Sequence, residues 1–284
     1  TGYAKSAAKI VNYLADRPDT DVVYYAFQNF PGQAIPDRFI DPRIKFVDAL
    51  ELDPISPKGF GDAGIVPTFT QEQPDVLFIY NDLPVCEAIL KLVGQVDCKI
   101  VLFLDLVYPW EDIERFEYLK SRVDLCYVLT QSWKDHMVDD LGWDPEVIVP
   151  FHLGVDFKNK IDPKLAKKYF GFSENDFIIL NLNRNSYRKQ WSTTIRAWFR
   201  FWIDNNMDPK IKLFVGCLLV TSDGYDIRNL IKIECMKNKI DPKFVMENNI
   251  FINPTPIVAS DEYIQTLYSA CDVGINTCCG EGMV

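Results

Sequence analysis

The stretch NLNRNSYRKQW (residues 181–191) concentrates the residue types that are best suited to binding an anion. It follows FIIL (177–180), an apolar run that predicts a buried strand, and it carries Arg184, Arg188 and Lys189 with no acid between them. A helix is predicted to begin directly afterwards, and a helix N-terminus already favours negative charge. A forked guanidinium at 184 and an ammonium at 189 would therefore suit a diphosphate. A solvated basic turn is the alternative, and Arg188 is assigned to it.

Two glycine-containing loops at the chain ends could contribute to the same chemistry. In TGYAKS, at the start, Gly2 would let backbone N–H groups approach a ligand at a helix N-terminus, although any turn can need a glycine. In NTCCGEGMV, at the end, Gly280 and Gly282 permit a tight turn. Glu281 between them would then project its carboxylate toward hydroxyls or a developing positive charge. An exposed acid on a terminal loop is the alternative.

The overall charge excludes several classes of partner. The chain has 284 residues and a net charge of -10, from 40 acids and 30 bases. Such a surface repels nucleic-acid phosphates and anionic lipid, so no nucleic-acid partner is expected. No apolar run approaches the roughly 18 residues that a membrane span needs. A local basic cluster in so acidic a protein is therefore informative.

The eight cysteines and two histidines limit the possible site chemistry. No C-x-x-C pair occurs, and most cysteines lie in apolar runs such as DLCYVL and YSACDV. Buried, reduced thiols of this kind predict a reducing compartment, so a cytoplasmic location is expected. The only histidines are His136 and His152, which disfavours a zinc site and a histidine-based hydrolase triad.

Strands and helices alternate along the whole chain. Six strands and four helices are predicted before residue 151: strands over 21–27, 44–47, 75–80, 99–104, 124–129 and 146–150, and helices over 4–15, 84–94, 111–121 and 132–142. A second series follows the polar stretch 151–162: strands over 177–182, 211–216, 249–252 and 272–276, and helices over 191–205, 225–238 and 261–270. The alternation predicts an α/β protein with two Rossmann-like, doubly wound parallel-sheet domains, over residues 1–155 and 156–284.

Both chain ends are expected to be incomplete. The first predicted helix has no strand ahead of it, and the final Gly-rich loop stops where a helix should start. We therefore expect a strand before Thr1 and further secondary structure after Val284 in the natural protein.

The three polar loops together carry a family resemblance. Their order is a glycine loop opening the first domain, Arg184-x4-Lys189 after the first strand of the second domain, and G-E-G after its fourth strand. This order resembles the retaining GT-B glycosyltransferases of the large group 1 family, which includes sucrose synthases and bacterial glycan-building enzymes. FHLGVDF (151–157) is similar to that family's "hGVD" segment, and SDEYIQTLYSACDVGINT (260–277) is similar to its "s.eel..ly..aDv.v.ps" run.

The resemblance implies roles for particular residues. Arg184 and Lys189 match the pair that grips the donor pyrophosphate and stabilises the departing nucleoside diphosphate. Glu281 matches the first acid of the E-x7-E motif, whose second acid would lie beyond Val284, and Gly2 matches a phosphate-facing glycine. The first domain would face the acceptor and the second would bind the nucleotide sugar. Such enzymes usually need no cofactor or metal.

The sequence also departs from the family pattern. Asn183 and Gln190 stand where many members carry glycine. Asp105 stands where many carry histidine, and it either orients an acceptor hydroxyl or caps the following turn, with the cap preferred. Asn81 and Asp82 end another strand, and either contact the acceptor or form a turn before Pro84.

The expected activity is transfer of a sugar, with a hexose expected, from a nucleotide-diphosphate sugar to an unknown acceptor with retention. A non-catalytic glycan- or nucleotide-binding module with a GT-B shell is one alternative. Another GT-B enzyme, such as a sugar epimerase or phosphorylase, is the second.

Overall fold

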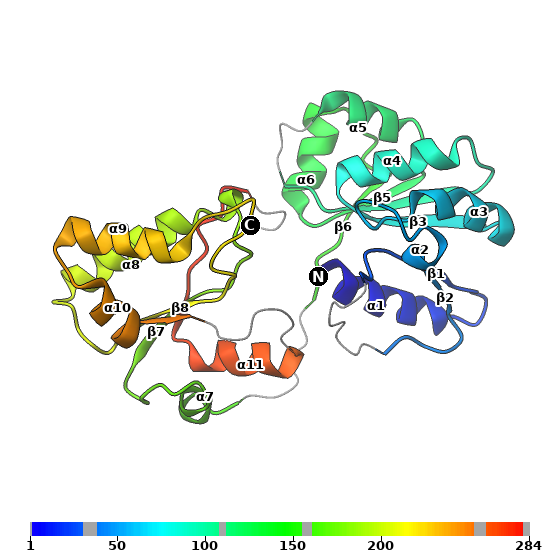
Figure 1. The fold of residues 1–284 in the computed structure, drawn as a ribbon. Coiled ribbons are helices and arrows are strands. Elements are labelled where there is room, and N and C mark those ends of the chain that lie inside the picture. The colour runs from blue at the N-terminus through cyan, green and yellow to red at the C-terminus, as the bar shows by residue number, and fades with distance from the viewer. Residues whose placement is uncertain (1, 31–38, 108–111, 155–160, 253–259, 281–284) are drawn as a thin grey trace. The chain divides into compact units, whose positions relative to one another are not determined.

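The structure is a computed structural model that describes residues 2–30, 39–107, 112–154, 161–252 and 260–280. These residues form two compact units, Thr1–Gly154 and Val155–Gly280. Each unit is described by itself, with the elements labelled as in Figure 1.

The first unit alternates strands with helices. Its elements are α1 (Gly2–Ala15), β1 (Val23–Ala26), β2 (Lys45–Asp48), α2 (Ala49–Leu52), α3 (Asp62–Glu72), β3 (Val76–Asn81), α4 (Leu83–Val93), β4 (Lys99–Leu104), α5 (Ile113–Lys120), β5 (Leu125–Val128), α6 (Gln131–Asp135), the π-helical turn η1 (His136–Asp140) and β6 (Ile148–Pro150).

Strands β3, β4, β5 and β6 form a parallel sheet in that order, and β1 pairs with β2, also in parallel. A buried core lies between this sheet and α3 to α6. On α1, Tyr3 packs edge-on against Tyr80 of β3.

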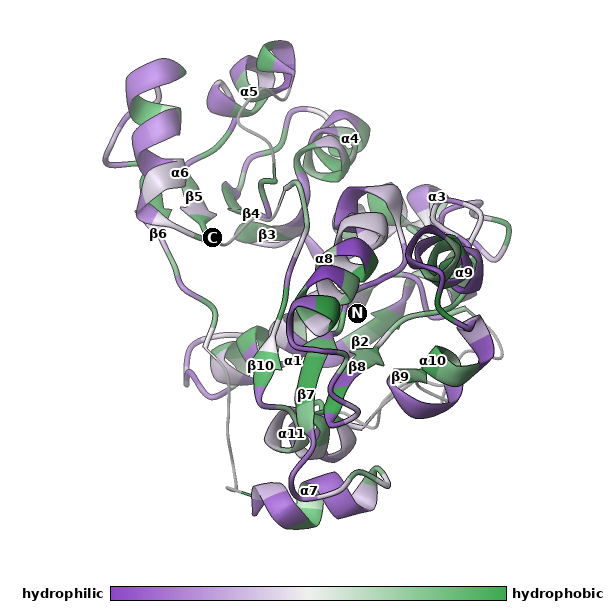
Figure 2. Cartoon of the chain, turned by 90° about the vertical axis from the view of Figure 1, so that its left-hand side faces the viewer, coloured by the Kyte–Doolittle hydropathy of each residue, from purple (hydrophilic) through white to green (hydrophobic). Residues whose placement is uncertain are grey.

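The second unit has the same alternation. Its elements are α7 (Pro163–Tyr169), β7 (Phe177–Asn181), the 3-10 turn η2 (Tyr187–Lys189), α8 (Trp191–Asp204), β8 (Ile211–Val215), α9 (Ile227–Asn238), α10 (Pro242–Asn248), β9 (Ile250–Ile252), α11 (Asp261–Ala270) and β10 (Val273–Gly274). The four strands are parallel and lie in the order β10-β7-β8-β9. One core joins the sheet to α8, α9 and α10, and a second core joins its other face to α7 and α11. Strand β7 is accordingly hydrophobic along most of its length (Figure 2).

The predicted fold class, α/β with two domains built on parallel sheets, is confirmed. Differences are local. Helix α3 was not predicted, because Gly64 and Pro67 interrupt its pattern. Helices α7 and α10 begin at Asp-Pro pairs that were recognised only as start signals: the Asp162 carboxylate accepts from Lys164 N at 2.7 Å, and Asp241 from Lys243 N at 3.0 Å. In the described part of the chain, no helix is long and apolar enough to cross a membrane.

Candidate functional site

The second unit has a topological switch point between β7 and β10. From β7 the chain builds β8 and β9 on one side, then returns to place β10 on the other side of β7. Loops that leave the carboxyl ends of two such strands run in opposite directions, and ligands of open parallel sheets bind between them. The loop after β7 contains Arg184 and Lys189, and the segment after β10 leads to Gly280. Sequence-predicted residues from two distant segments therefore share one sheet edge.

A row of hydrogen bonds joins these two segments. The Asn181 amide donates to Thr194 Oγ1 at 2.7 Å, and Thr194 Oγ1 lies 2.7 Å from Thr277 Oγ1. Thr277 Oγ1 in turn lies 3.0 Å from the carbonyl oxygen of Lys189 and 3.1 Å from that of Gln190. Since each hydroxyl has one hydrogen, the row runs in one direction: Asn181 donates to Thr194, Thr194 to Thr277, and Thr277 to a carbonyl. The backbone around Lys189 is thus fixed to the start of the segment after β10.

Asn183 adds a second connection through its side chain. Its amide donates to Asn181 Oδ1 at 2.6 Å and to Asn276 Oδ1 at 3.3 Å. Asn276 Oδ1 also accepts from the backbone N–H of Cys278 at 3.1 Å. Where the resembling family often has glycine, this chain therefore uses an asparagine to hold the two strand ends together.

Arg184 lies at this edge with its side chain largely in solvent. The guanidinium forms an ion pair with Asp223, and the two side chains are 74% and 48% exposed. The Arg184 carbonyl accepts from the Trp191 indole N–H at 3.3 Å, which fixes the backbone below the exposed side chain. Asp223 was not recognised in the sequence, because nothing local places the loop after β8 beside the loop after β7.

The neighbouring Asn185 is buried and fixes that contact. Its side chain donates to the carbonyls of Leu218 and Tyr225 at 2.9 and 2.7 Å, and accepts from Tyr225 N at 3.0 Å. A Cβ at Gly224 would lie 2.5 Å from the Asn185 carbonyl oxygen, so this close approach requires glycine. The loop that carries Asp223 is therefore built against the loop that carries Arg184.

Lys189 ends the turn η2 just before α8. Gln190 follows with φ 52° and ψ 44°, a left-handed conformation, at a position where the resembling family often has glycine. Among the described residues no side chain caps α8, whereas Asp226 caps α9 and Ser260 caps α11. The first N–H groups of α8 are thus not taken by a side-chain cap, and such groups favour an anion.

Arg188 does not lie in a solvated turn. Its Nη1 donates to the carbonyl oxygen of Gly280 and contacts Cys278 Sγ at 3.4 Å, and the side chain is half-buried. The assignment of Arg188 to a solvated basic turn was wrong, because the pairing of β10 with β7 brings residues 278–280 against it. Glu281 and Gly282 lie outside the described residues.

The predicted acceptor-side residues lie at the carboxyl edge of the first unit. Asp82 caps α4 by accepting from Val85 N at 3.3 Å, and Asn81 Oδ1 accepts from Asp82 N at 3.0 Å. Asp105 N donates to the Asn81 carbonyl at 3.1 Å, which places the ends of β3 and β4 side by side. Gly2 is the first residue of α1.

Tyr3 is a residue of this edge that the sequence did not indicate. Its hydroxyl hydrogen-bonds the Asp105 carboxylate. Burial raises the pKa of Tyr3 well above its usual range, and the nearby Asp105 and Asp82 charges raise it further. Tyr3 therefore stays a hydrogen-bond donor to Asp105. A tyrosine on a helix that precedes the sheet gives no local signal of this contact.

The cysteines match the expectation of buried thiols only in part: Cys86, Cys126 and Cys235 are buried, whereas Cys279 is exposed and the other four are half-buried. All eight lie within the described residues and are free. Burial raises the pKa of Cys235 to about 11 and the pKa values of Cys217 and Cys271 to about 12. Thiols of this kind are poor nucleophiles at neutral pH. No cluster of metal-ligating side chains was found in the part of the chain that the structure describes.

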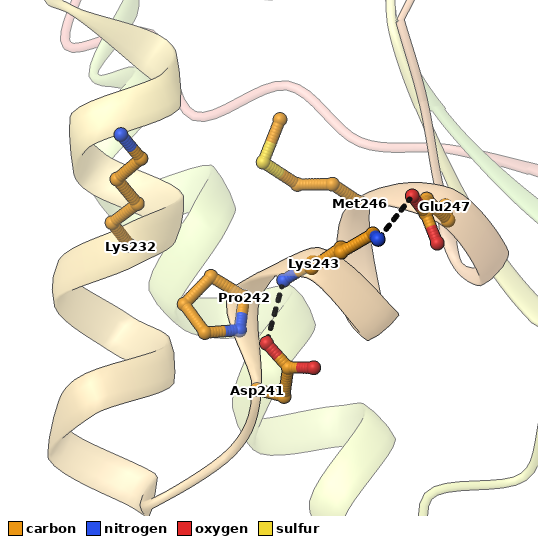
Figure 3. A pocket seen from close by; sticks show the side chains of 6 residues that line it. All are labelled: Lys232, Asp241, Pro242, Lys243, Met246 and Glu247. Carbon is orange, nitrogen blue, oxygen red and sulfur yellow. Dashed lines mark hydrogen bonds and ion pairs between the residues drawn. The ribbon is translucent and has the colours of Figure 1, made fainter.

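A groove with a volume of about 590 Å³ lies between α9 and α10, away from these residues. Its lining consists of Lys232, Asp241, Pro242, Lys243, Met246 and Glu247 (Figure 3). Asp241 caps α10, and Lys243 pairs with Glu247 at 3.9 Å. Since α10 leads directly into β9, it adjoins the amino edge of the sheet, opposite the switch-point edge. The groove contains none of the predicted site residues.

Known structures decide the fold family. No protein-family model and no curated protein matches the chain. A trehalose-6-phosphate synthase studied for glycosyl transfer with retention is 14% identical, with a TM-score of 0.60 over 100% of this chain and 76% of its own. The apo structure of OtsA is 17% identical, with a TM-score of 0.56 over 84% of this chain and 61% of its own. Anabaena HepE in complex with UDP and glucose is 16% identical, with a TM-score of 0.52 over 83% of this chain and 60% of its own.

The chain has the GT-B fold of glycosyltransferases. It spans about three fifths of the length of HepE and OtsA. At these identities the likeness establishes the GT-B architecture and leaves the residue roles to be argued from this chain.

Proposed function

We propose that this chain belongs to a retaining glycosyltransferase that moves a sugar, with a hexose expected, from a nucleotide-diphosphate sugar to an unknown acceptor. The GT-B fold supports this class of reaction, and HepE has been solved with UDP-glucose. We expect no cofactor or metal beyond the nucleotide sugar, and a cytoplasmic location.

One observation carries the proposal. Arg184 presents an exposed guanidinium at the switch point of the second unit, five residues before Lys189 and beside α8, for which the described residues supply no side-chain cap. Three sources of positive potential thus lie on one loop, while the protein as a whole is acidic. A diphosphate is the anion that best matches a forked guanidinium, an ammonium and helix N–H groups.

The chemistry assigns each residue a different role. As the bond between sugar and phosphate breaks, charge accumulates on the leaving diphosphate, so Arg184 and Lys189 stabilise the transition state more than the ground state. Glu281, on a loop that Gly280 and Gly282 allow to turn tightly, would bind the donor sugar's hydroxyls. Gly2 would approach the donor phosphates.

The first unit would supply the acceptor contacts. Asp105, which accepts a hydrogen bond from the Tyr3 hydroxyl, would orient an acceptor hydroxyl. Asn81 and Asp82 adjoin it, although the Asp82 carboxylate already caps α4.

Calorimetry with UDP and GDP tests the diphosphate site. A hydrogen bond to a charged group contributes roughly 1.5–3 kcal/mol, so Arg184→Ala should weaken binding of the cognate nucleotide by about ten- to a hundredfold. Arg184→Lys should recover only part of this loss, since a point charge cannot reproduce the fork. Arg200→Ala is the control, because it removes the same charge from the far part of α8. This variant should bind the nucleotide as tightly as the wild type does. Equally tight binding by Arg184→Ala and the wild type would contradict the proposal.

Turnover separates an enzyme from a binding module. The full-length protein should release a nucleoside diphosphate from at least one nucleotide sugar of a panel, and Arg184→Ala should lose more turnover than binding. Nucleotide binding without release from any sugar would favour a non-catalytic module.

A further inference from the structure

The turn that carries Lys189 and the segment that leads to Glu281 are held together at one side chain. Arg188 Nη1 donates to the Gly280 carbonyl oxygen and contacts Cys278 Sγ at 3.4 Å. The Arg188 carbonyl accepts from Cys279 N at 3.0 Å. Both ends of this arginine, its backbone and its guanidinium, therefore bind the same short segment.

The place of Arg188 in the chain gives these contacts their importance. Arg188 directly precedes Lys189, and Gly280 directly precedes Glu281. Gly280 has no side chain with which to fix its own conformation, so its backbone needs an external contact to hold one geometry. The guanidinium provides that contact, because its several donors can satisfy two acceptors at once.

Other connections within the described residues hold the start of the same segment. Thr277 and Asn276 hold the start of the segment through Thr194 and Asn183. Within the described residues, the side-chain hydrogen bonds to the Gly280 carbonyl come from Arg188 and from the neighbouring Cys278 thiol. Of these two, only Arg188 belongs to the loop after β7.

We propose that Arg188 is a positioning residue that sets the backbone before Glu281 relative to Lys189, without itself binding the donor. The inference rests on the proposed function. Arg188 thereby couples the residue that stabilises the leaving group with the residue assigned to the sugar. A small displacement of a catalytic group can lower the reaction rate by a large factor. Substitution of Arg188 should therefore lower kcat more than it weakens nucleotide binding.

Arg188→Ala tests this with donor kinetics on the full-length protein. We expect kcat to fall by roughly ten- to a hundredfold, the equivalent of losing one charge-assisted hydrogen bond, while the Kd for UDP or GDP changes by less than about threefold. Arg188→Lys keeps the charge but not the fork, so it should recover only part of kcat. Free guanidinium added to Arg188→Ala should restore some activity. The matched control is Arg200→Ala, which should retain wild-type kcat.

Three outcomes would overturn the inference. These are a wild-type kcat in Arg188→Ala, full recovery by lysine, or a nucleotide Kd that weakens as much as kcat falls. The last two would indicate that Arg188 contributes charge to the diphosphate site directly.

Hydrogen exchange separates failure of this inference from failure of the proposed function. The amides of residues 278–280 should exchange faster in Arg188→Ala than in the wild type and in Arg200→Ala, whatever the activity. Unchanged exchange would refute the positioning role. A wild type without nucleotide binding or turnover would refute the proposed function instead.

Discussion

At the scale of single residues, the candidate site is defined by what each basic side chain binds. Arg184 is exposed and pairs with Asp223, whereas Arg188 is half-buried and holds a loop. Two arginines four positions apart therefore have different roles, although both carry the same charge. The anion beside Arg184 in this structure is a carboxylate of the protein itself.

The Asp223 carboxylate should compete with a bound diphosphate. Exposed ion pairs contribute about 0.2–1 kcal/mol, so Asp223→Asn should tighten UDP or GDP binding by up to about fivefold, and high salt should reduce the gain. Calorimetry at low and high ionic strength measures it. Asp204→Asn, which frees Arg200 instead, is the control and should leave the Kd unchanged. Weaker binding by Asp223→Asn would mean that the carboxylate helps the ligand.

At the scale of elements, the two units use the same device to register neighbouring strands. Asp124, before β5, accepts from Ile100 N at 2.8 Å and donates its own N–H to the Ile100 carbonyl at 2.9 Å. Asp272, before β10, does the same with Ile178 N and O at 2.8 and 3.0 Å. The aspartate of the family-like run over 260–277 therefore has a structural task, since it fixes β10 beside β7 and so places the site segment.

The two aspartates should differ in their contribution to stability. Asp272 also pairs at 2.9 Å with Lys167, whose side chain is 8% exposed, whereas the partner of Asp124 is Lys99, which is 72% exposed. Removing a partner from a buried charge costs far more than removing it from an exposed one. Asp272→Ala should therefore lower the free energy of unfolding by about 2–4 kcal/mol, and Asp124→Ala by about 1 kcal/mol.

Urea unfolding of the two variants measures this difference. Adding Lys167→Met to Asp272→Ala should recover part of the loss, because no unpaired ammonium then remains buried. Equal losses in the two single variants would contradict the assignment of Lys167 to a buried pair.

At the scale of the whole molecule, both units bury groups that ionise at high pH. Burial raises the pKa of Tyr25 to about 12 in the first unit, and it raises the pKa values of Cys217 and Cys271 to about 12 in the second. A folded-state pKa above the unfolded value means that the protonated form is favoured by folding. The stabilisation of the fold by these protonated groups is fully present below their unfolded-state pKa, near 9 to 10. It is lost as the pH rises toward their folded-state pKa of about 12.

Melting temperature should therefore fall steadily above about pH 9. Scans of the wild type and Tyr25→Phe in the presence of a reductant measure the effect. The phenylalanine cannot ionise, so this variant should show a weaker fall even though it loses the hydrogen bond to the Gly61 carbonyl. Identical pH dependence in the two proteins would exclude Tyr25 as a contributor.

The sequence by itself determined the alternation of strands and helices, the two parallel-sheet domains and the basic loop after β7. These features depend on local periodicity and on residues close together in the chain, such as the Asp-Pro pairs that begin α7 and α10. It missed α3, where Gly64 and Pro67 obscure the pattern, and it recognised the starts of α7 and α10 without predicting these helices.

Only the tertiary structure decided which loops meet. The pairing of β10 with β7, instead of with the outer strand β9, brings Thr277 and Gly280 to Lys189 and Arg188. The contact between Asp223 and Arg184 likewise joins loops from two different strands. Strand order depends on how helices cover both faces of a sheet, a property of contacts between residues far apart in sequence, and no local pattern of residues contains it.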